Sequence, residues 1–358
     1  MRRAGVLLVV AACTRPAEQR AEAELSVGSA AITDAEIRID GGLAAIRELA
    51  DGRVELWSSA PILDIELAVD STAAGNWTFT IRNSLPDAVL STGGAVITRE
   101  PGQHPTVGIF NTVLAEGTHR LHLAPPDGDL VAPFKVAAMA DIQTALPVVD
   151  QIFARISEVP DLRFVVGMGD ITERSLVEEY DLFERQLVSL EIPFYTTLGN
   201  HELWAPYARF HDRFGRGSFQ FQFKGAYFTF ADSGDAGIDP LVEDWIVDWL
   251  ATAHDHTSIF LTHFPPLDPV GIRYGGFRST QDARRLIARL VEGNVDLMLY
   301  GHIHTYLAYE QAGIPAFISG GGGANPMAWD GIDRHFLVVD IDPAGAKTIR
   351  SVDVHRVD

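Results

Sequence analysis

Residues 134–143 read FKVAAMADIQ, a mostly apolar run that ends in polar residues. The run lacks helical spacing and is typical of a strand that is buried on both faces of a sheet. Asp141 and Gln143 follow directly, so polar side chains come where the strand ends. Strands of this kind belong to sheets covered by helices, and the stretch therefore predicts an α/β domain.

Four more strands of the same type follow along the chain. We expect them at 163–168, 193–198, 258–262 and 296–300. Segments with helical periodicity alternate with the strands and lie at 146–156, 176–190, 241–250 and 283–291. This alternation predicts that the α/β domain extends over residues 131–358.

The polar residues after these five strands are of types that bind metal ions. They are Asp141, Gln143, Asp170, Asn200, His263, His302 and His304. Ligands of open α/β sheets bind beside the carboxyl ends of the strands, so we expect these side chains to converge. Imidazole suits Zn, Fe, Mn, Cu and Ni, and carboxylate and carboxamide oxygens are harder ligands. Two cations about 3.5–4 Å apart can hold a phosphate and activate a water between them.

Five short motifs carry a resemblance to a known family. They are D-I-Q at 141–143, G-D at 169–170, G-N-H-E at 199–202, H-F-P-P at 263–266 and G-H-I-H at 301–304. In this order, each after a predicted strand, they resemble the calcineurin-like metallophosphoesterase superfamily over about residues 134–358. The resemblance implies a four-layer αββα sandwich that hydrolyses a phosphate ester, either a phosphomonoester or a phosphodiester.

The resemblance also implies roles for the site residues. Asp170 would bridge two divalent metal ions. Asp141, Gln143 and His304 would complete the first metal site, and Asn200, His263 and His302 the second. His201 would polarise the phosphate or protonate the leaving oxygen, and a hydroxide bridging the metals would attack phosphorus in line.

Two positions depart from the family's usual pattern. Purple acid phosphatases, which also carry an N-terminal β-sandwich, have a tyrosine ligand where this chain has Glu173, so we do not expect a tyrosine-ligated iron. The family usually has histidine where this chain has Gln143. We therefore expect a weaker first site that favours Mn²⁺ over Fe²⁺ or Zn²⁺. The alternative is a non-catalytic, metal-binding cell-surface protein that retains the fold.

Several loop residues are candidates for contact with the substrate. Arg273, Tyr274 and Arg278 lie on the loop after His263, and Trp204 lies just past the G-N-H-E motif. They could bind the phosphate or the organic part of the ester, although each is also compatible with a solvated loop. The role of Glu202 also has two interpretations: it either orients a site residue or is a solvated loop residue.

The N-terminal part has a different hydrophobic periodicity. Apolar and polar residues alternate with period two in runs at 35–40, 53–57, 65–70, 77–82 and 119–123. Turn-forming residues separate these runs, which predicts an antiparallel β-sandwich of immunoglobulin or fibronectin-III type over residues 31–126. The chain has one cysteine, so neither the Cys–Trp–Cys core of antibody domains nor any intramolecular disulfide is possible.

The first residues look like a secretory signal. Two arginines and an apolar run precede Cys13, as in a bacterial lipoprotein signal over residues 1–13, whose cysteine is lipidated. The apolar run is too short to span a hydrocarbon core of ~30 Å, so a transmembrane helix is the weaker interpretation. We expect export to a bacterial cell envelope, in the periplasm or at the surface, with membrane contact through the lipid anchor. Residues 14–30 are polar and predict a tether.

Charge and size limit the remaining possibilities. The 358-residue chain is long enough for two domains. Its net charge is −20 and it has no visible basic stripe, so nucleic-acid binding is not expected. The substrate expected is a small-molecule or polymeric phosphate ester. Because the average charge of the protein repels phosphate, bound metal cations must attract the substrate locally.

Overall fold

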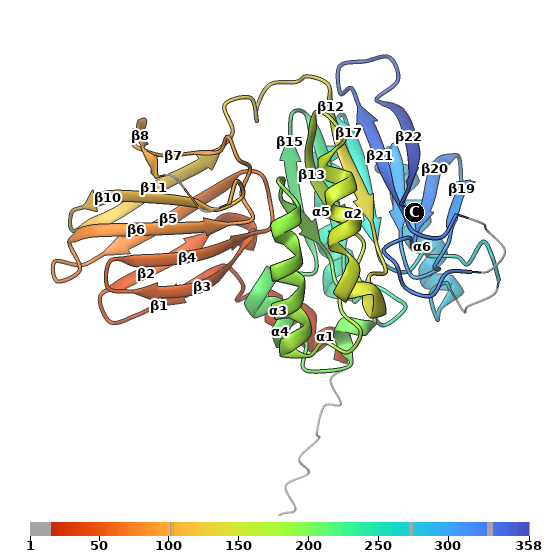
Figure 1. Cartoon of the computed structure of the whole chain (residues 1–358), viewed down its shortest axis with the longest axis horizontal. Coiled ribbons are helices and arrows are strands. Elements are labelled where there is room, and N and C mark those ends of the chain that lie inside the picture. The colour runs from red at the N-terminus through yellow and green to blue at the C-terminus, as the bar shows by residue number, and fades with distance from the viewer. Residues whose placement is uncertain (1–15, 101, 103, 272–274, 328–331, 358) are drawn as a thin grey trace, which may run out of the picture.

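The computed structural model describes residues 16–100, 102, 104–271, 275–327 and 332–357. The predicted signal and Cys13 lie outside the described residues. A β-rich N-terminal part, coloured red to yellow in Figure 1, stands beside a larger α/β part. The chain passes from one part to the other between residue 124, where the last strand of the N-terminal part ends, and residue 134, where the next strand begins.

The N-terminal part is built from two sheets. The first has six strands, in the order β1 (Ser29–Ala31), β2 (Ala35–Ile39), β5 (Leu63–Val69), β11 (Gly117–Ala124), β7 (Val89–Thr92) and β8 (Ala95–Ile97). The second has five, in the order β3 (Ala44–Ala50), β4 (Arg53–Ser58), β6 (Gly75–Arg82), β10 (Gly108–Leu114) and β9 (Arg99–Glu100). Alternate residues such as Ile65, Leu67, Leu56 and Phe79 are buried in one apolar cluster. This alternation is the period-two pattern of the sequence.

One strand pair of this part departs from the antiparallel prediction. β4 and β6 are parallel, with Leu56 opposite Ile81. The two strands are joined through β5, which belongs to the other sheet, so the chain returns to the second sheet in the same direction. The other strand pairs described here are antiparallel. The immunoglobulin-type topology remains a prediction.

The α/β part also has two sheets. One contains β14 (Phe194–Thr196), β13 (Leu162–Gly167), β12 (Phe134–Met139), β21 (His335–Ile341) and β22 (Ile349–Arg356), in this order. The other contains β15 (Phe219–Phe223), β16 (Ala226–Ala231), β17 (Thr257–Thr262), β18 (Leu297–Tyr300), β20 (Ile314–Ser319) and β19 (Tyr306–Gln311). The strands β12, β13 and β14 are parallel, as are β16, β17 and β18. Each set therefore sends its carboxyl ends to one edge.

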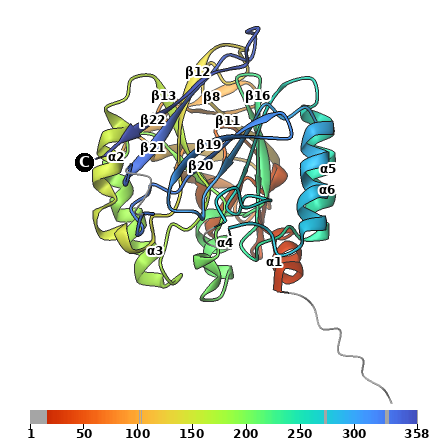
Figure 2. The ribbon, with the colours of Figure 1, turned by 90° about the vertical axis from the view of Figure 1, so that its right-hand side faces the viewer.

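Helices cover the outer faces of both sheets, which gives the predicted four layers (Figure 2). α2 (Asp150–Ser157) and α3 (Val177–Gln186) cover the first sheet, and α5 (Pro240–Ala253) and α6 (Thr280–Glu292) cover the second. α4 (Ala208–Phe214) lies between α3 and the sandwich strands β3 and β4. Short 3₁₀ turns occupy Asp40–Gly42, Gln143–Val148, Leu187–Ser189 and His201–Leu203.

Strand residues alternate between two buried environments in this part. In β12, Val136 and Ala138 face the other sheet, whereas Ala137 and Met139 face the helices. The space between the sheets is filled largely by aromatic rings, with Phe164 packed edge-on against Phe221, Phe223 and Phe228. Burial on both faces explains why these strands read as continuous apolar runs.

Asn83 and Arg47 are among the side chains that join the sandwich to the α/β part. The side chain of Asn83 forms the two hydrogen bonds that a neighbouring strand would form. Its Oδ1 accepts from Phe194 N at 2.8 Å, and its Nδ2 donates to Phe194 O at 2.9 Å. It thereby pairs with β14, an edge strand of its sheet. Arg47 donates two hydrogen bonds to Glu184 and stacks over Trp57 at 4.3 Å.

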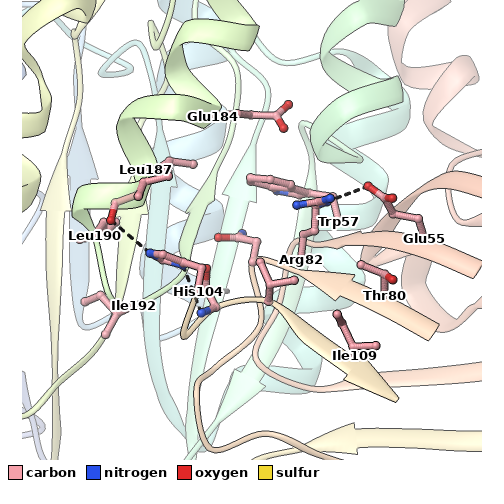
Figure 3. A pocket seen from close by; sticks show the side chains of 14 residues that line it. Glu55, Trp57, Thr80, Arg82, His104, Ile109, Glu184, Leu187, Leu190 and Ile192 are labelled. Atoms are coloured by element: carbon pink, nitrogen blue, oxygen red, sulfur yellow. Dashed lines mark hydrogen bonds and ion pairs between the residues drawn. The ribbon is translucent and has the colours of Figure 1, made fainter. Parts of the chain in front are cut away.

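A cavity of about 510 Å³ lies along this junction (Figure 3). Its wall combines sandwich residues such as Trp57 and Ile109 with Leu187 and Ile192 of the α/β part. Charged groups in the wall have partners: Arg82 donates to Glu55 at 2.7 Å, and the ring of His104 lies 3.2 Å from Val188 O. The wall contains none of the predicted metal ligands.

Within the predicted tether at 14–30, the described residues 16–30 differ from what their composition predicts. Residues Pro16–Glu24 form helix α1, which packs on α5 and buries Arg20, Ala21 and Glu24. Arg20 and Glu24 are polar but have buried partners far along the chain, which a local pattern cannot show. Among the described helices, none has the length and apolar character needed to cross a membrane.

Candidate metal centre

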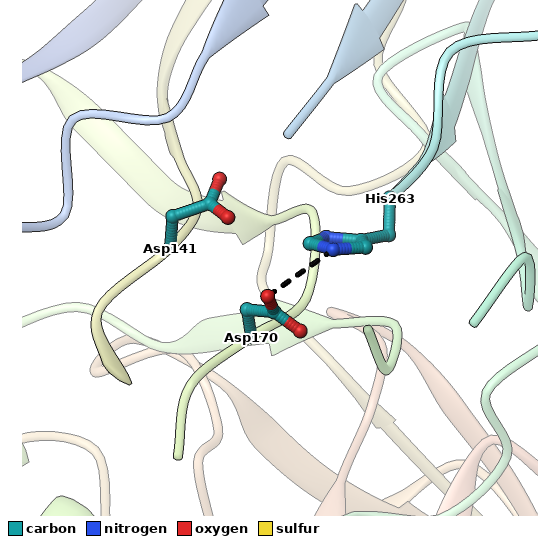
Figure 4. Close-up of side chains that lie close together, drawn as sticks. All are labelled: Asp141, Asp170 and His263. Carbon is teal, nitrogen blue, oxygen red and sulfur yellow. Dashed lines mark ion pairs between the residues drawn. The ribbon is translucent and has the colours of Figure 1, made fainter. Parts of the chain in front are cut away.

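Five loops at the carboxyl ends of β12, β13, β14, β17 and β18 bring the predicted ligands together. One group consists of Asp141, Asp170 and His263, whose ligand atoms all lie within 4.8 Å of one another. Figure 4 shows the three side chains pointing toward one another from separate loops. All three are buried, so the group lies below the protein surface.

The other four predicted ligands surround this group. Asn200 Oδ1 lies 3.1 Å from both His263 Nε2 and His302 Nδ1. His304 Nε2 lies 3.4 Å from Asp141 Oδ1. Gln143 Nε2 donates to Asp170 Oδ2 at 2.6 Å and lies 3.3 Å from His304 Nε2. All seven residues that the sequence singled out thus lie in one cluster, with Asp170 at its centre.

Unusual backbone conformations aim these side chains. Four of the seven have positive φ angles: 63° at Asp141, 45° at Gln143, 55° at Asp170 and 67° at His302. Such conformations are unfavourable for residues with a Cβ atom and concentrate at functional sites. Here they turn the chain sharply at the strand ends, where Ile142 N donates to Asp170 O at 2.9 Å.

Glycines allow the loops to approach the carboxylates. A Cβ atom at Gly199 would lie 2.1 Å from Asp170 Oδ1, and one at Gly301 would lie 2.9 Å from Asp141 Oδ2. The glycines of the G-N-H-E and G-H-I-H motifs are therefore required by the crowding around the two aspartates. Any larger residue would push Asn200 or His302 away from the cluster.

Backbone carbonyls fix the protonation of two histidines. His263 Nδ1 lies 2.7 Å from Met168 O, and His304 Nδ1 lies 2.8 Å from Asn325 O. A carbonyl oxygen can only accept, so each Nδ1 carries a proton and each Nε2 is the nitrogen directed at the cluster, where a metal ion would take the place of any proton on it. This arrangement is typical of histidines that bind metal ions.

The electrostatics of the cluster fit divalent cations. Oδ1 of Asp141 is buried and accepts no hydrogen bond from the residues that the structure describes, which is costly for a carboxylate. Burial disfavours the charged forms of both Asp170 and His263. Their mutual attraction nevertheless raises the pKa of His263 to about 9 and holds the pKa of Asp170 well below its ordinary value. Three imidazoles with carboxylate and amide oxygens suit two metal ions such as Mn²⁺, Fe²⁺ or Zn²⁺.

The sequence profile of calcineurin-like phosphoesterases matches residues 134–306, which contain all seven clustered residues. The chain carries a calcineurin-like phosphoesterase domain. The family predicted from the motifs is thereby confirmed for this domain, and the match supports metal-dependent hydrolysis of phosphate esters. No curated protein matches the sequence.

The fold is similar to that of purple acid phosphatase PPD1 from yellow lupin (Lupinus luteus) seeds. The TM-score is 0.54 at 13% identity, over 83% of this chain and 72% of that chain. This likeness concerns the fold alone. A dimetal phosphatase from Danio rerio matches 64% of this chain and 100% of its own at 11% identity, with a TM-score of 0.48.

His201 lies beside the cluster of predicted metal ligands in the phosphoesterase domain. Its Nδ1 donates to Glu173 O at 2.7 Å, which leaves Nε2 at 3.9 Å from Asp170 Oδ2. Its backbone N–H donates to Asp170 Oδ1 at 2.9 Å, and its ring stacks on Trp204 with centroids 5.3 Å apart. The ring is thus held on two sides with one nitrogen directed toward the centre.

The structure decides between the two interpretations of Glu202. Its side chain is fully buried, and its Oε2 accepts from Asp170 N at 2.9 Å and Gly199 N at 2.8 Å. Its Oε1 accepts from both the backbone N–H and the hydroxyl of Thr172. Burial, followed by the charge of Asp170, raises the pKa of Glu202 above its ordinary value. Glu202 therefore ties the loop of Asp170 to the loop of Asn200.

We expect Glu202→Ala to weaken Mn²⁺ binding by roughly 10–100-fold, as loss of a group that orients metal ligands commonly does. The variant leaves three backbone N–H groups without their acceptor, so the two loops lose their common anchor. Calorimetric titration with Mn²⁺ measures the effect. Glu178→Ala, which removes an exposed carboxylate of α3, is the control. Unchanged Mn²⁺ affinity in Glu202→Ala would contradict the assignment.

The structure describes two of the four residues predicted to contact the substrate. Arg273 and Tyr274 lie outside the described residues. Arg278 is exposed, and its backbone N–H donates to Ala236 O at 2.8 Å. Trp204 contacts a site residue directly, because its ring stacks on that of His201 while the residue remains 64% exposed.

Proposed function

We propose that the protein hydrolyses small-molecule or polymeric phosphate esters with two divalent metal ions, of which Mn²⁺ is favoured. The observation that carries the proposal is the convergence of seven potential ligands from five strand ends on Asp170. Asp141, Gln143 and His304 would hold one ion and Asn200, His263 and His302 the other, with Asp170 shared. Bound ions of this kind neutralise phosphate charge and lower the pKa of water to roughly 7.

The protein's own groups would position the ester and move a proton. Because Glu173 O fixes Nδ1 of His201 as a donor, Nε2 is the nitrogen available to the substrate. In its protonated form Nε2 could donate to a phosphate oxygen or to the leaving oxygen. Glu202 would keep the loops of Asp170 and Asn200 at a fixed distance from each other during the reaction.

The preference for Mn²⁺ is based on Gln143. Its carboxamide stands where the family usually has an imidazole. Rotation of the carboxamide by about 180° would direct its oxygen, in place of its nitrogen, at the metal site beside Asp170. An oxygen donor shifts the first site toward harder cations. The proposal of manganese as the native metal rests on this substitution.

We expect the metal-stripped protein to hydrolyse p-nitrophenyl phosphate or bis(p-nitrophenyl) phosphate after Mn²⁺ is added, and to lose activity with a chelator. Zn²⁺ and Fe²⁺ are tested in parallel, and comparison of the two esters separates monoesterase from diesterase activity. Absence of hydrolysis with every metal and ester would favour the non-catalytic metal-binding protein.

We also propose that the leaving group is planar or aromatic. Trp204 stacks on His201 with an interplanar angle of 13°, so its exposed ring lies beside the residue proposed to protonate the leaving oxygen. An aromatic leaving group could bury part of this exposed ring surface. A simple alkyl group would gain less from the same contact.

We expect Trp204→Ala to lower kcat/KM for phenyl phosphate by roughly 3–10-fold, the effect of one aromatic contact, and that for propyl phosphate by less than about 2-fold. Steady-state kinetics on both esters measure the difference. Trp204→Phe retains a ring and should keep most of the preference. Equal losses on the two esters would show that Trp204 supports His201 rather than the substrate.

Export as a lipid-anchored protein of a bacterial envelope, periplasmic or at the cell surface, is proposed from the sequence of residues 1–13. Incorporation of labelled fatty acid into the wild type, and its loss in Cys13→Ala, tests this. Absence of label from the wild type would refute it.

A further inference from the structure

Helix α1 is part of the α/β body although the sandwich separates the two in sequence. It precedes the matched phosphoesterase domain by the whole N-terminal β-rich part. Ala21 is buried against the apolar side chains Val242 and Ile246 of α5. Figure 1 shows α1 at the lower edge of the α/β part, beyond the sandwich strands. The phosphoesterase domain is thus completed by a segment outside it.

A buried arginine is the main polar contact of α1. Arg20 is only 2% exposed, and it donates through Nε to Asp232 Oδ2 and through Nη1 to Asp235 Oδ2, both at 2.8 Å. Asp232 directly follows β16, so it stands at the same strand edge as His263, which follows the neighbouring strand β17. One arginine therefore holds both ends of the short loop 232–235.

Glu24, one turn further along α1, holds a second segment. Its carboxylate accepts from Gly217 N at 2.8 Å and from Ser218 N at 3.1 Å. The hydroxyl of Ser218 accepts from Asp232 N at 3.0 Å, which joins this contact to the first. Gly217 O in turn accepts from the hydroxyl of Thr197, which lies just before the G-N-H-E motif.

The loop held by Arg20 packs on the chain segments that carry residues of the metal centre. Ser233 Oγ accepts from the backbone N–H of Phe264, the neighbour of His263, at 2.8 Å. Gly234 lies against the other side: a Cβ there would be 2.9 Å from both Gly199 O and a methyl group of Leu203. The loop therefore lies between the segment of His263 and the turn that carries Asn200 and His201, and it contacts both.

We propose that α1 is a strap that positions the metal-binding loops, and that Arg20 is its main positioning residue. Through loop 232–235, Arg20 fixes the distance between the His263 segment and the turn of residues 199–203. The inference rests on the proposed function for its catalytic consequence, but the ordering of the loops is measurable without activity. The competing interpretation is that the Arg20 ion pairs only stabilise the folded protein.

The test compares Arg20→Ala and Arg20→Lys with Arg47→Ala in the full chain. Arg47 is a matched control, since it is also an arginine with a carboxylate partner, Glu184, but lies at the sandwich junction. We expect Arg20→Ala to lower kcat by roughly 10–100-fold with little change in KM, because small displacements of positioned groups are costly. Lysine should restore part of the loss, and Arg47→Ala should leave kcat unchanged.

Two further readouts do not depend on hydrolysis. Hydrogen–deuterium exchange should become faster in Arg20→Ala at residues 198–203 and 232–235 but not in the central strands, and Mn²⁺ affinity should fall. All measurements are made below the melting temperature, which circular dichroism establishes. If Arg20→Ala does not fold, Arg20→Lys and Glu24→Gln are compared with the wild type in the same way.

A lower melting temperature with wild-type kcat, Mn²⁺ affinity and exchange at residues 198–203 would overturn the proposal and leave Arg20 a stabilising residue only. A wild type that hydrolyses no ester would instead refute the proposed function. In that case exchange and Mn²⁺ titration still decide whether α1 orders the metal-binding loops.

Discussion

Asp170→Asn should lose its bound metal ions and slow the hydrolysis of phosphate esters by about 10³-fold or more, equivalent to about 4 kcal/mol of transition-state stabilisation. Asp170 is the residue that the two proposed metal sites would share. Its Oδ2 lies 3.3 Å from His263 Nε2, of the proposed second site, and accepts from Gln143 Nε2, of the proposed first site. Asparagine keeps the shape but removes the charge, so the remaining ligands lack the anion that attracts two cations.

Metal content after gel filtration and Mn²⁺ titration measure the first effect, and steady-state kinetics measure the second. The amide oxygen that Asp170→Asn introduces can still accept the hydrogen bond from His201 N, so the circular dichroism spectrum should remain that of the wild type. Asp244→Asn on the exposed face of α5 is the control for loss of one negative charge. Full metal content in Asp170→Asn would contradict the central position assigned to this residue.

The strand ends were predictable because two local signals coincide there. An apolar run such as 134–140 predicts a buried strand, and a metal-binding residue directly after it predicts a place at the carboxyl edge. The structure has β12 at Phe134–Met139 and places Asp141 beside Asp170. Parallel strands make this inference general, because every such strand ends at the same edge.

Contacts between distant polar residues were not predictable in this way. Arg20 and Glu24 lie in a segment of tether-like composition, and their partners are more than 190 positions away. Glu202 adjoins the motif residue His201, yet its four hydrogen bonds go to backbone and hydroxyl donors that no spacing reveals. Such contacts depend on the assembled fold, so one sequence carries no periodic signal for them.

His201→Ala should lower kcat by about 10²–10⁴-fold, the usual contribution of a general acid, while metal content stays at the wild-type level. The geometry supports this separation of effects. His201 Nε2 lies 3.9 Å from Asp170 Oδ2, farther than His263 Nε2, and Nδ1 is occupied by Glu173 O. His254→Ala, at an exposed position, is the control. Loss of metal in parallel with activity would make His201 a ligand instead.

The same variant separates the two roles that His201 can have. If Nε2 protonates the leaving oxygen, the loss should be large for an alkyl ester and small for p-nitrophenyl phosphate, whose leaving group needs no proton. If Nε2 instead polarises the phosphate, both esters should lose activity equally, because the phosphate is common to them. The proposed contact of Trp204 with an aromatic leaving group favours the first outcome, since Trp204 stacks on His201.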